Sequence, residues 1–245
     1  MKPILIIKTG STFPEISKDR GDFEDWIIAG MGLDRSRFLI VDVSQGEVLP
    51  DYDEISGIAI TGSHAMVTDH ADWSESTAAW LIRAVEKEIP SLGICYGHQL
   101  LAYAFGGEVA NNPNGIEFGT AEIVLTVAAI KDPLFSILPS KASVQATHTQ
   151  SVTKLPPGAK LLASTSLDPN HAFVIGDSAW GVQFHPEFNA DIVKRYIRKL
   201  PSGKNLNLEE LVKNTFDTPI GDQFLKRIAE IVIKKITKPQ NYLQN

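Results

Sequence analysis

A cysteine, a histidine and a glutamate lie in two short segments whose residue types suit nucleophilic catalysis. The first segment is Gly-Ile-Cys-Tyr-Gly, with Cys95 at its centre, and the second is Gly-Val-Gln-Phe-His-Pro-Glu, which contains His185 and Glu187. Because side chains alternate between the two faces of an extended chain, His185 and Glu187 are expected to point the same way. A thiol nucleophile, a histidine base and a carboxylate that orients the histidine can together form a catalytic triad.

Cys95 is expected at a sharp turn between a buried strand and a helix. Such a turn projects the nucleophile above the sheet, and flanking glycines leave room for the neighbouring elements. The start of the following helix favours the thiolate, and the backbone amide of Tyr96 is placed to donate to an oxyanion. Gly62, after a predicted strand, is a candidate second donor. The alternative for Cys95 is a small buried apolar residue, and for Gly62 an ordinary turn.

His185 and Glu187 could instead form a structural pair near the end of a hairpin. The presence of Cys95 in a plausible setting argues against that alternative, because nucleophile, base and acid then all occur in one chain. The remaining histidines show no spacing typical of metal ligands; they are His64, His70, His98, His148 and His171. The sequence therefore predicts no metal, and no other cofactor.

Short apolar runs alternate with helical patterns in the first part of the chain. Strands are predicted over residues 3–8, 38–43, 57–61 and 90–94. Helices are predicted over residues 23–32, 73–87 and 98–105. This alternation is typical of right-handed βαβ units and predicts an α/β fold with a doubly wound, mostly parallel sheet flanked by helices. The active site of such a sheet is expected at the carboxyl ends of its strands.

From residue 108 the pattern changes to strands with little helix between them. These strands are predicted at residues 122–127, 144–146, 161–164, 172–175 and 180–185. The Gly-Asp-Ser sequence at 176–178 predicts a hairpin between the last two strands, and thus a small antiparallel extension that carries His185 and Glu187. The C-terminal part is predicted to be helical, because Asn207 and Glu210 have capping-box spacing and an apolar stripe runs from Phe224 to Val232.

The composition of the chain argues against several classes of function. The chain has 245 residues, of which 43% are hydrophobic and 21% are charged, with a formal net charge of −6. This balance is ordinary for a globular protein, and its mild acidity argues against nucleic acid or anionic lipid as a partner. A single cysteine cannot form an internal disulfide, so a cytoplasmic location is expected. No apolar run approaches the length of a membrane span.

Two motifs together resemble the class I, triad-type glutamine amidotransferases. Residues 93–102, Gly-Ile-Cys-Tyr-Gly-His-Gln-Leu-Leu-Ala, look like the nucleophile segment of that family, and residues 181–187 look like its His-Pro-Glu segment. The resemblance is strongest to the glutaminase domain of GMP synthase and its free-standing relatives, and it covers residues 1–199. Residues 217–221 are similar to the C-terminal helix region of such free-standing proteins. The resemblance implies a flavodoxin-like domain over 1–199, with residues 200–245 forming a C-terminal helical extension that packs on it.

The resemblance also implies roles for individual residues. Cys95 would attack the side-chain amide of glutamine to give a γ-glutamyl thioester and ammonia, with His185 as acid and base and Glu187 as its orienter. Gly62 and Tyr96 would supply the oxyanion amides. Substrate contacts are implied for Gln99, His148, Thr149, Gln150 and Ser151. Three positions depart from the family pattern, since Thr61, Thr149 and Gln150 replace Gly, Gly and Asp. These departures leave the γ-glutamyl substrate open.

Several functions remain compatible with these residues. The first is a free-standing glutaminase or γ-glutamyl hydrolase. The second is a glutaminase subunit that delivers ammonia to a separate synthetase, because no Ser-Gly-Gly-x-Asp-Ser loop or phosphate-binding loop occurs in this sequence. A binding module without activity is a third alternative, which the intact triad disfavours. A cysteine protease or chaperone-like relative fits poorly with the His-Pro-Glu segment.

Overall fold

The computed structural model describes residues 2–201 and 207–237; the parts of the predicted C-terminal extension at 202–206 and 238–245 lie outside the described residues. The strands are β1 (Ile4–Lys8), β2 (Phe38–Asp42), β3 (Gly57–Ile60), β4 (Ser91–Ile94), β5 (Glu108–Asn111), β6 (Glu117–Leu125), β7 (Lys141–His148), β8 (Gln150–Lys154), β9 (Lys160–Ser164), β10 (Ala172–Ile175) and β11 (Ala179–Val182). The helices are α1 (Pro14–Arg20), α2 (Phe23–Met31), α3 (Asp72–Glu86), α4 (Tyr96–Ala104), α5 (Val127–Lys131), α6 (Ala190–Ile197), α7 (Leu208–Asn214) and α8 (Ile220–Thr237).

A nine-stranded sheet, counted over the described residues, runs in the order β2-β1-β3-β4-β11-β10-β9-β6-β7. The first five strands pair in parallel, and the pairs from β11–β10 through to β6–β7 are antiparallel. The predicted α/β fold with a mostly parallel central sheet is confirmed. The antiparallel part is larger than expected, because β6 and β7 are long strands and β5 pairs with β8 in a second small sheet.

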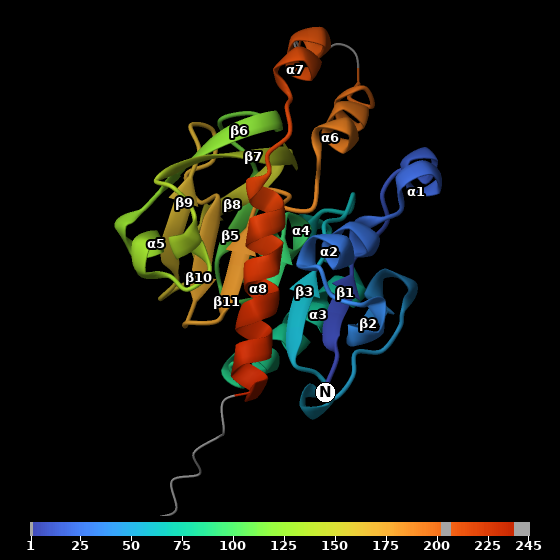
Figure 1. The fold of residues 1–245 in the computed structure, drawn as a ribbon, viewed down its shortest axis with the longest axis vertical. Helices are drawn as coiled ribbons and strands as arrows, with labels where there is room; N and C mark the ends of the chain where they lie inside the picture. Colours follow the sequence, from blue (N-terminus) through green and yellow to red (C-terminus); the bar gives the residue numbers. More distant parts are fainter. Residues whose placement is uncertain (1, 202–206, 238–245) are drawn as a thin grey trace, which may run out of the picture.

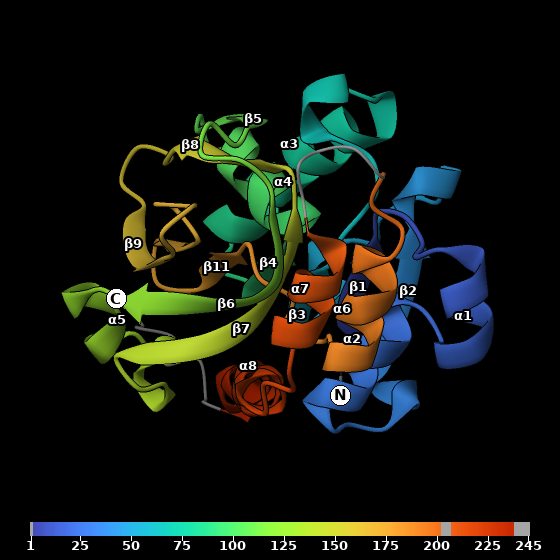
Figure 2. The ribbon, with the colours of Figure 1, turned by 90° about the horizontal axis from the view of Figure 1, so that it is seen from above.

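Helices cover both faces of the parallel strands, and Figure 2 shows α3 and α4 on one side with α2 and α8 on the other. Alternate residues of β1 separate accordingly. Ile4 and Ile6 belong to the core that includes α2 and α8, whereas Leu5 and Ile7 belong to the core that includes α3 and α4. This division follows from the two-residue period of a strand, which turns successive side chains to opposite faces.

Strand β11 lies in the interior of the sheet, between β4 and β10. The predicted hairpin with β10 is present, with Ala172 opposite Val182 and Ile175 opposite Ala179. Because β11 also pairs in parallel with β4, the segment that carries His185 and Glu187 leaves a central strand rather than a strand at the edge of the sheet. It therefore emerges at the same end of the sheet as Cys95.

The C-terminal helix α8 runs along the sheet beside β11 and β3 (Figure 1). Its predicted apolar stripe is buried, with Phe224, Leu225 and Ile228 at most 1% exposed. Gly30 of α2 gives room for Leu225, since a Cβ on Gly30 would lie 2.3 Å from Leu225 Cδ1. Among the described helices, none combines the length and the apolar character that a membrane crossing requires.

Candidate active site

Cys95 occupies the bend between β4 and α4, as predicted. Its φ of 51° and ψ of −97° are unusual for a residue with a side chain, so this backbone is strained. The flanking glycines permit the bend. A Cβ on Gly93 would lie 2.4 Å from the carbonyl oxygen of Gly97, and a Cβ on Gly97 would lie 2.7 Å from that of Ile60. The sequence Gly-Ile-Cys-Tyr-Gly is therefore matched to a turn in which three backbone segments touch.

His185 and Glu187 form a direct pair two residues apart. The Nδ1 atom of His185 lies 2.7 Å from Oε1 of Glu187, and both side chains are buried. Since a carboxylate only accepts, Nδ1 donates, and Nε2 is the nitrogen left to face a nucleophile. Within the described residues, Nε2 makes no hydrogen bond of good geometry. The ring of Phe188 stacks on that of His185 with centroids 4.0 Å apart, which fixes the orientation of the imidazole.

The tertiary structure brings Cys95 and His185 together beside Gly62. A Cβ on Gly62 would lie 3.0 Å from Cε1 of His185 and 3.8 Å from Cβ of Cys95. Burial alone would lower the pKa of His185, but the charges of Glu187 and Cys95 and the hydrogen bond with Glu187 outweigh it and raise this pKa to about 10. The imidazole therefore holds its proton between a carboxylate and the sulfur at neutral pH.

Two backbone amides are candidates for an oxyanion hole. The amide of Tyr96 is at the first position of α4, where helix geometry provides no internal acceptor. Gly62 ends the segment after β3, and its carbonyl accepts hydrogen bonds from the hydroxyls of Thr9 and Thr61 at 3.1 and 3.0 Å. The backbone amide of Thr9 also donates to Oγ1 of Thr61 at 3.0 Å. Thr61, which departs from the family's glycine, thus anchors the segment that carries Gly62.

The loop with His185 and Glu187 is braced by the C-terminal segment. The backbone amide of His185 donates to the carbonyl of Gln145 at 2.8 Å, and the side chain of Gln145 donates to the carbonyl of Phe216 at 2.7 Å. Asp217 accepts from the amide of Ala190 at 2.9 Å. Phe216 and Asp217, at the start of the segment 217–221 that resembles free-standing relatives, therefore support the loop of His185 and Glu187.

A cavity of about 170 Å³ opens beside Cys95. Four of the expected substrate residues line it: Gln99, His148, Thr149 and Gln150. Ser151 is not among the residues that line the cavity, because Gln150 and Ser151 are successive residues of β8 whose side chains face opposite ways. A substrate contact at Ser151 stays a prediction. The amide of Gln99 donates to the carbonyl of Gln150 and to Oε1 of Gln183, both at 3.0 Å.

Sequence reasoning missed the apolar wall of this cavity. The wall includes Phe13, Met66, Phe118, Tyr196 and Leu200. The rings of Phe13 and Tyr196 pack with centroids 5.2 Å apart, although the two residues belong to opposite ends of the chain. His64 also lines the cavity, and burial lowers its pKa. No sequence signal could have found these residues, because they come from four distant segments with no shared spacing.

A family model described as glutamine amidotransferase class-I matches residues 39–199. The chain belongs to this family. As a class-I glutamine amidotransferase, it is 29% identical over 190 residues to gamma-glutamyl peptidase 4 of Arabidopsis thaliana, an alignment that covers 76% of each chain. It is 37% identical over 140 residues to GMP synthase [glutamine-hydrolyzing] of Porphyromonas gingivalis, which is 56% of this chain but only 26% of that enzyme.

Solved structures agree with this assignment at the level of the fold. A glutamine amidotransferase from Thermotoga maritima superposes on this amidotransferase with a TM-score of 0.76, at 23% identity, and the match covers 96% of this chain and 99% of the other. A glutamine amido transferase from Methylobacillus flagellatus gives a TM-score of 0.75 at 21% identity, with 100% and 99% covered. The predicted family is confirmed, and the fold match extends over nearly the whole chain.

Proposed function

We propose that the protein hydrolyses γ-glutamyl amides through a Cys95–His185–Glu187 triad and a γ-glutamyl thioester. The observation that carries the proposal is the 2.7 Å pair between His185 and Glu187, whose imidazole and Cys95 both lie close to Gly62. This arrangement supplies a nucleophile, a general acid and base, and a carboxylate that orients the base.

In the first half-reaction, the sulfur of Cys95 attacks the γ-carbonyl carbon and forms the C–S bond. The amides of Gly62 and Tyr96 donate to the carbonyl oxygen as it gains negative charge. The imidazolium of His185 then gives a proton to the leaving nitrogen, the C–N bond breaks, and ammonia or an amine departs. The raised pKa of His185 suits this step, because it ensures that the proton is present at neutral pH.

In the second half-reaction, water attacks the thioester. His185, neutral after the first step, removes a proton from the water and keeps it as the imidazolium that Glu187 stabilises. The C–S bond breaks, the sulfur leaves as a thiolate, glutamate departs, and the initial state is restored. A nucleophile that cycles through a thioester requires a reduced thiol, and we therefore also propose a cytoplasmic location.

The apolar wall favours a substituted amide over free glutamine. Ammonia is small and polar and gains nothing from contact with Phe118, Tyr196 and Leu200, whereas an aromatic or aliphatic amine would bury apolar area there. The name of the Arabidopsis relative, a gamma-glutamyl peptidase, points in the same direction. We propose that a γ-glutamyl peptide or a related γ-glutamyl amide is the preferred substrate.

The test is glutamate release from a panel that contains glutamine, γ-glutamylphenylalanine and γ-glutamyl-p-nitroanilide. We expect turnover that is abolished in Cys95→Ala, and a covalent γ-glutamyl adduct on Cys95 when the reaction is quenched in acid and examined by mass spectrometry. Absence of both turnover and adduct across the panel would contradict the proposal.

A second candidate is a glutaminase subunit that supplies ammonia to a separate synthetase. The observation in its favour is the similarity to the glutaminase part of GMP synthase. Among the described residues, the apolar stripe of α8 is buried within the chain, so this stripe is not a docking surface for a synthetase. Sedimentation and kinetics discriminate between the two: a fully active monomer excludes an obligatory partner.

A further inference from the structure

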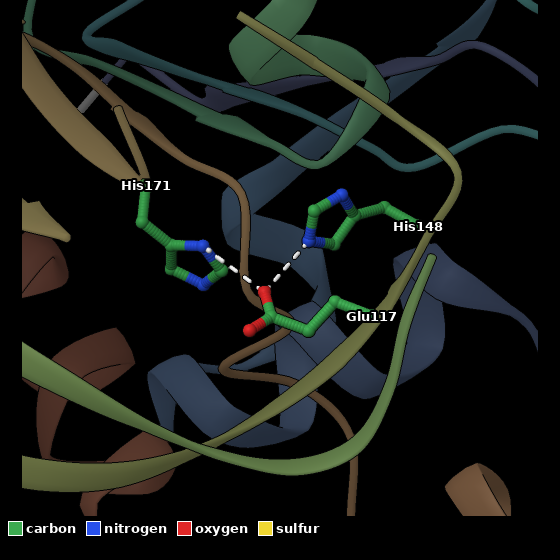
Figure 3. Close-up of side chains that lie close together, drawn as sticks. All are labelled: Glu117, His148 and His171. Atoms are coloured by element: carbon green, nitrogen blue, oxygen red, sulfur yellow. Dashed lines mark hydrogen bonds and ion pairs between the residues drawn. The ribbon is translucent and has the colours of Figure 1, made fainter. Parts of the chain in front are cut away.

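A cluster of buried ionisable side chains lies between β6, β7 and the segment that precedes β10 (Figure 3). It contains Glu117 from the start of β6, His148 from the end of β7, and His171 from the residue before β10. These residues are 6%, 3% and 0% exposed. One donor atom from each, two imidazole nitrogens and one carboxylate oxygen, converges with the others within 4.8 Å.

The contact between His148 and Glu117 requires a cation. The Nδ1 atom of His148 lies 2.9 Å from the carbonyl oxygen of Gln150, and since a carbonyl only accepts, Nδ1 carries a hydrogen. The Nε2 atom of the same ring lies 2.9 Å from Oε2 of Glu117. In a neutral imidazole this Nε2 would present a lone pair to a carboxylate oxygen, which is repulsive. Either a proton or a metal ion must lie between them.

If a proton lies between His148 and Glu117, other buried polar atoms of the cluster still have no hydrogen-bond partner. Both ring nitrogens of His171 and Oδ2 of Asp168 have no hydrogen-bond partner within the described residues, although both side chains are 0% exposed. The Nδ1 atom of His171 lies 3.5 Å from Oε2 of Glu117 and 3.4 Å from Oδ2 of Asp168. Buried polar atoms without partners are costly. A single divalent ion at the centre would bind one ring nitrogen of His171 together with Nε2 of His148 and a carboxylate oxygen of Glu117.

The spacing fits three ligands of one small ion. Zinc bound at 2.0–2.1 Å in a tetrahedron holds its nitrogen and oxygen ligands about 3.3 Å apart. The separations of 2.9 Å between His148 and Glu117 and of 3.5 Å between His171 and Glu117 bracket that value. The bond from His148 Nδ1 to a backbone carbonyl is the outer contact that metal-bound histidines usually make.

We propose that Glu117, His148 and His171 bind a divalent transition-metal ion, with zinc the best match to the donor set and the fourth position of its tetrahedron left open. This departs from the prediction of no metal, which relied on spacing along the chain. The ligands come from three separate segments and no sequence motif links them. The ion would be structural, since it would fix His148 and with it the carbonyl of Gln150, which accepts from Gln99 at the cavity.

The test begins with metal analysis of untagged protein purified without chelators or added metal. We expect about one zinc ion per chain by elemental mass spectrometry. Removal with a chelator should lower the melting temperature, and added zinc should restore it. Cobalt(II) should give the intense visible bands of a tetrahedral site. These measurements use the unaltered protein, so they do not depend on whether any variant folds.

Variants then locate the ion. Glu117→Gln and His171→Ala should lose the metal, whereas His70→Ala should retain it. His70 is the matched control, because it forms an equivalent 2.9 Å pair with Glu75 on the surface. Substoichiometric metal together with a melting temperature that does not respond to zinc, manganese, cobalt or nickel would overturn the proposal and assign a proton to the His148–Glu117 contact. Metal that persists in His171→Ala would also overturn it.

Discussion

Gly221 of α8 lies against the triad loop so closely that a Cβ on it would stand 2.2 Å from the carbonyl oxygen of Pro186. Pro186 separates His185 from Glu187. The C-terminal helix therefore begins in contact with the peptide that sets the geometry of the catalytic pair. A helix distant from Cys95 in sequence thus contributes to the position of the base.

Gly221→Ala should displace the triad loop. The added methyl group meets backbone rather than a flexible side chain, so the loop must move, and a displacement near 1 Å can lower a catalytic rate about 10²-fold. We expect a large fall in kcat with a smaller change in melting temperature. Gln223→Ala, an exposed position on the same helix, is the control and should leave kcat unchanged. Equal kcat values for the two variants would show that α8 does not position the base.

The pH dependence of the protein's stability should report the charge on His185. Its pKa is raised to about 10, against burial, by Glu187 and Cys95. A raised pKa means that the imidazolium contributes stability fully below the unfolded value near 6.5 and loses that contribution as pH rises toward about 10. Glu187→Gln removes the strongest raising influence, so the loss should shift to lower pH. Melting temperatures of the wild type and of Glu187→Gln, measured across this pH range, test the predicted direction of the shift. If stability depends on pH in the same way in both proteins, the prediction is contradicted.

The Glu187→Gln variant should also lose catalytic activity, and its activity should depend on a lower pKa. Without a carboxylate, the imidazolium is less stable and its ring is held less firmly, so kcat/KM should fall about 10²–10⁴-fold. The alkaline limb of the kcat/KM profile should also move to lower pH. A uniform loss of activity with an unchanged profile would indicate a structural defect instead.

Thr61→Val should weaken the oxyanion segment. Valine has a similar shape but lacks the hydroxyl that accepts from Thr9 and donates to Gly62. Since Thr61 is fully buried, the lost hydrogen bonds should cost about 1–3 kcal/mol in stability. We expect a fall in kcat as well, because Gly62 loses an anchor. Thr61→Ser keeps the hydroxyl and should retain most of both properties, measured by thermal melts and steady-state kinetics.

Phe118→Ala should alter substrate preference. Phe118 lines the apolar wall of the cavity, and its loss removes contact area worth about 1.5–3 kcal/mol for an aromatic leaving group, or about 10–100-fold in kcat/KM. Glutamine should be affected less, because its leaving group is ammonia. Val124→Ala, an exposed position on the same strand, is the control. If both substrates lose activity in equal proportion, the wall does not select the leaving group.

Leu225→Ala should destabilise the whole domain. We propose that the C-terminal helices and residues 1–199 form one folding unit, and Leu225 is fully buried between α8 and α2. Truncation of a buried leucine costs about 2–5 kcal/mol. A single unfolding transition at lower temperature is expected by calorimetry. Two separate transitions, with only the smaller one shifted, would show that α8 folds as an independent appendage.

Most local elements and the residues of the proposed triad could be predicted from the sequence alone. Strand–turn–helix chemistry around Cys95 and the two-residue spacing of His185 and Glu187 depend on neighbouring residues, so they can be read along the chain. The alternation of apolar runs and helical patterns predicted the parallel sheet for the same reason. The position of β11 inside the sheet could not be read in this way, because strand order depends on contacts between distant segments.

Which distant residues share a site could be seen only in the three-dimensional structure. The apolar wall joins Phe13 to Tyr196, the brace joins Gly221 to Pro186, and the buried cluster joins Glu117 to His171. Each contact depends on the way in which the long strands and the C-terminal helix cross the sheet. No local spacing encodes such contacts, since their energy comes from packing among segments that are far apart in the chain.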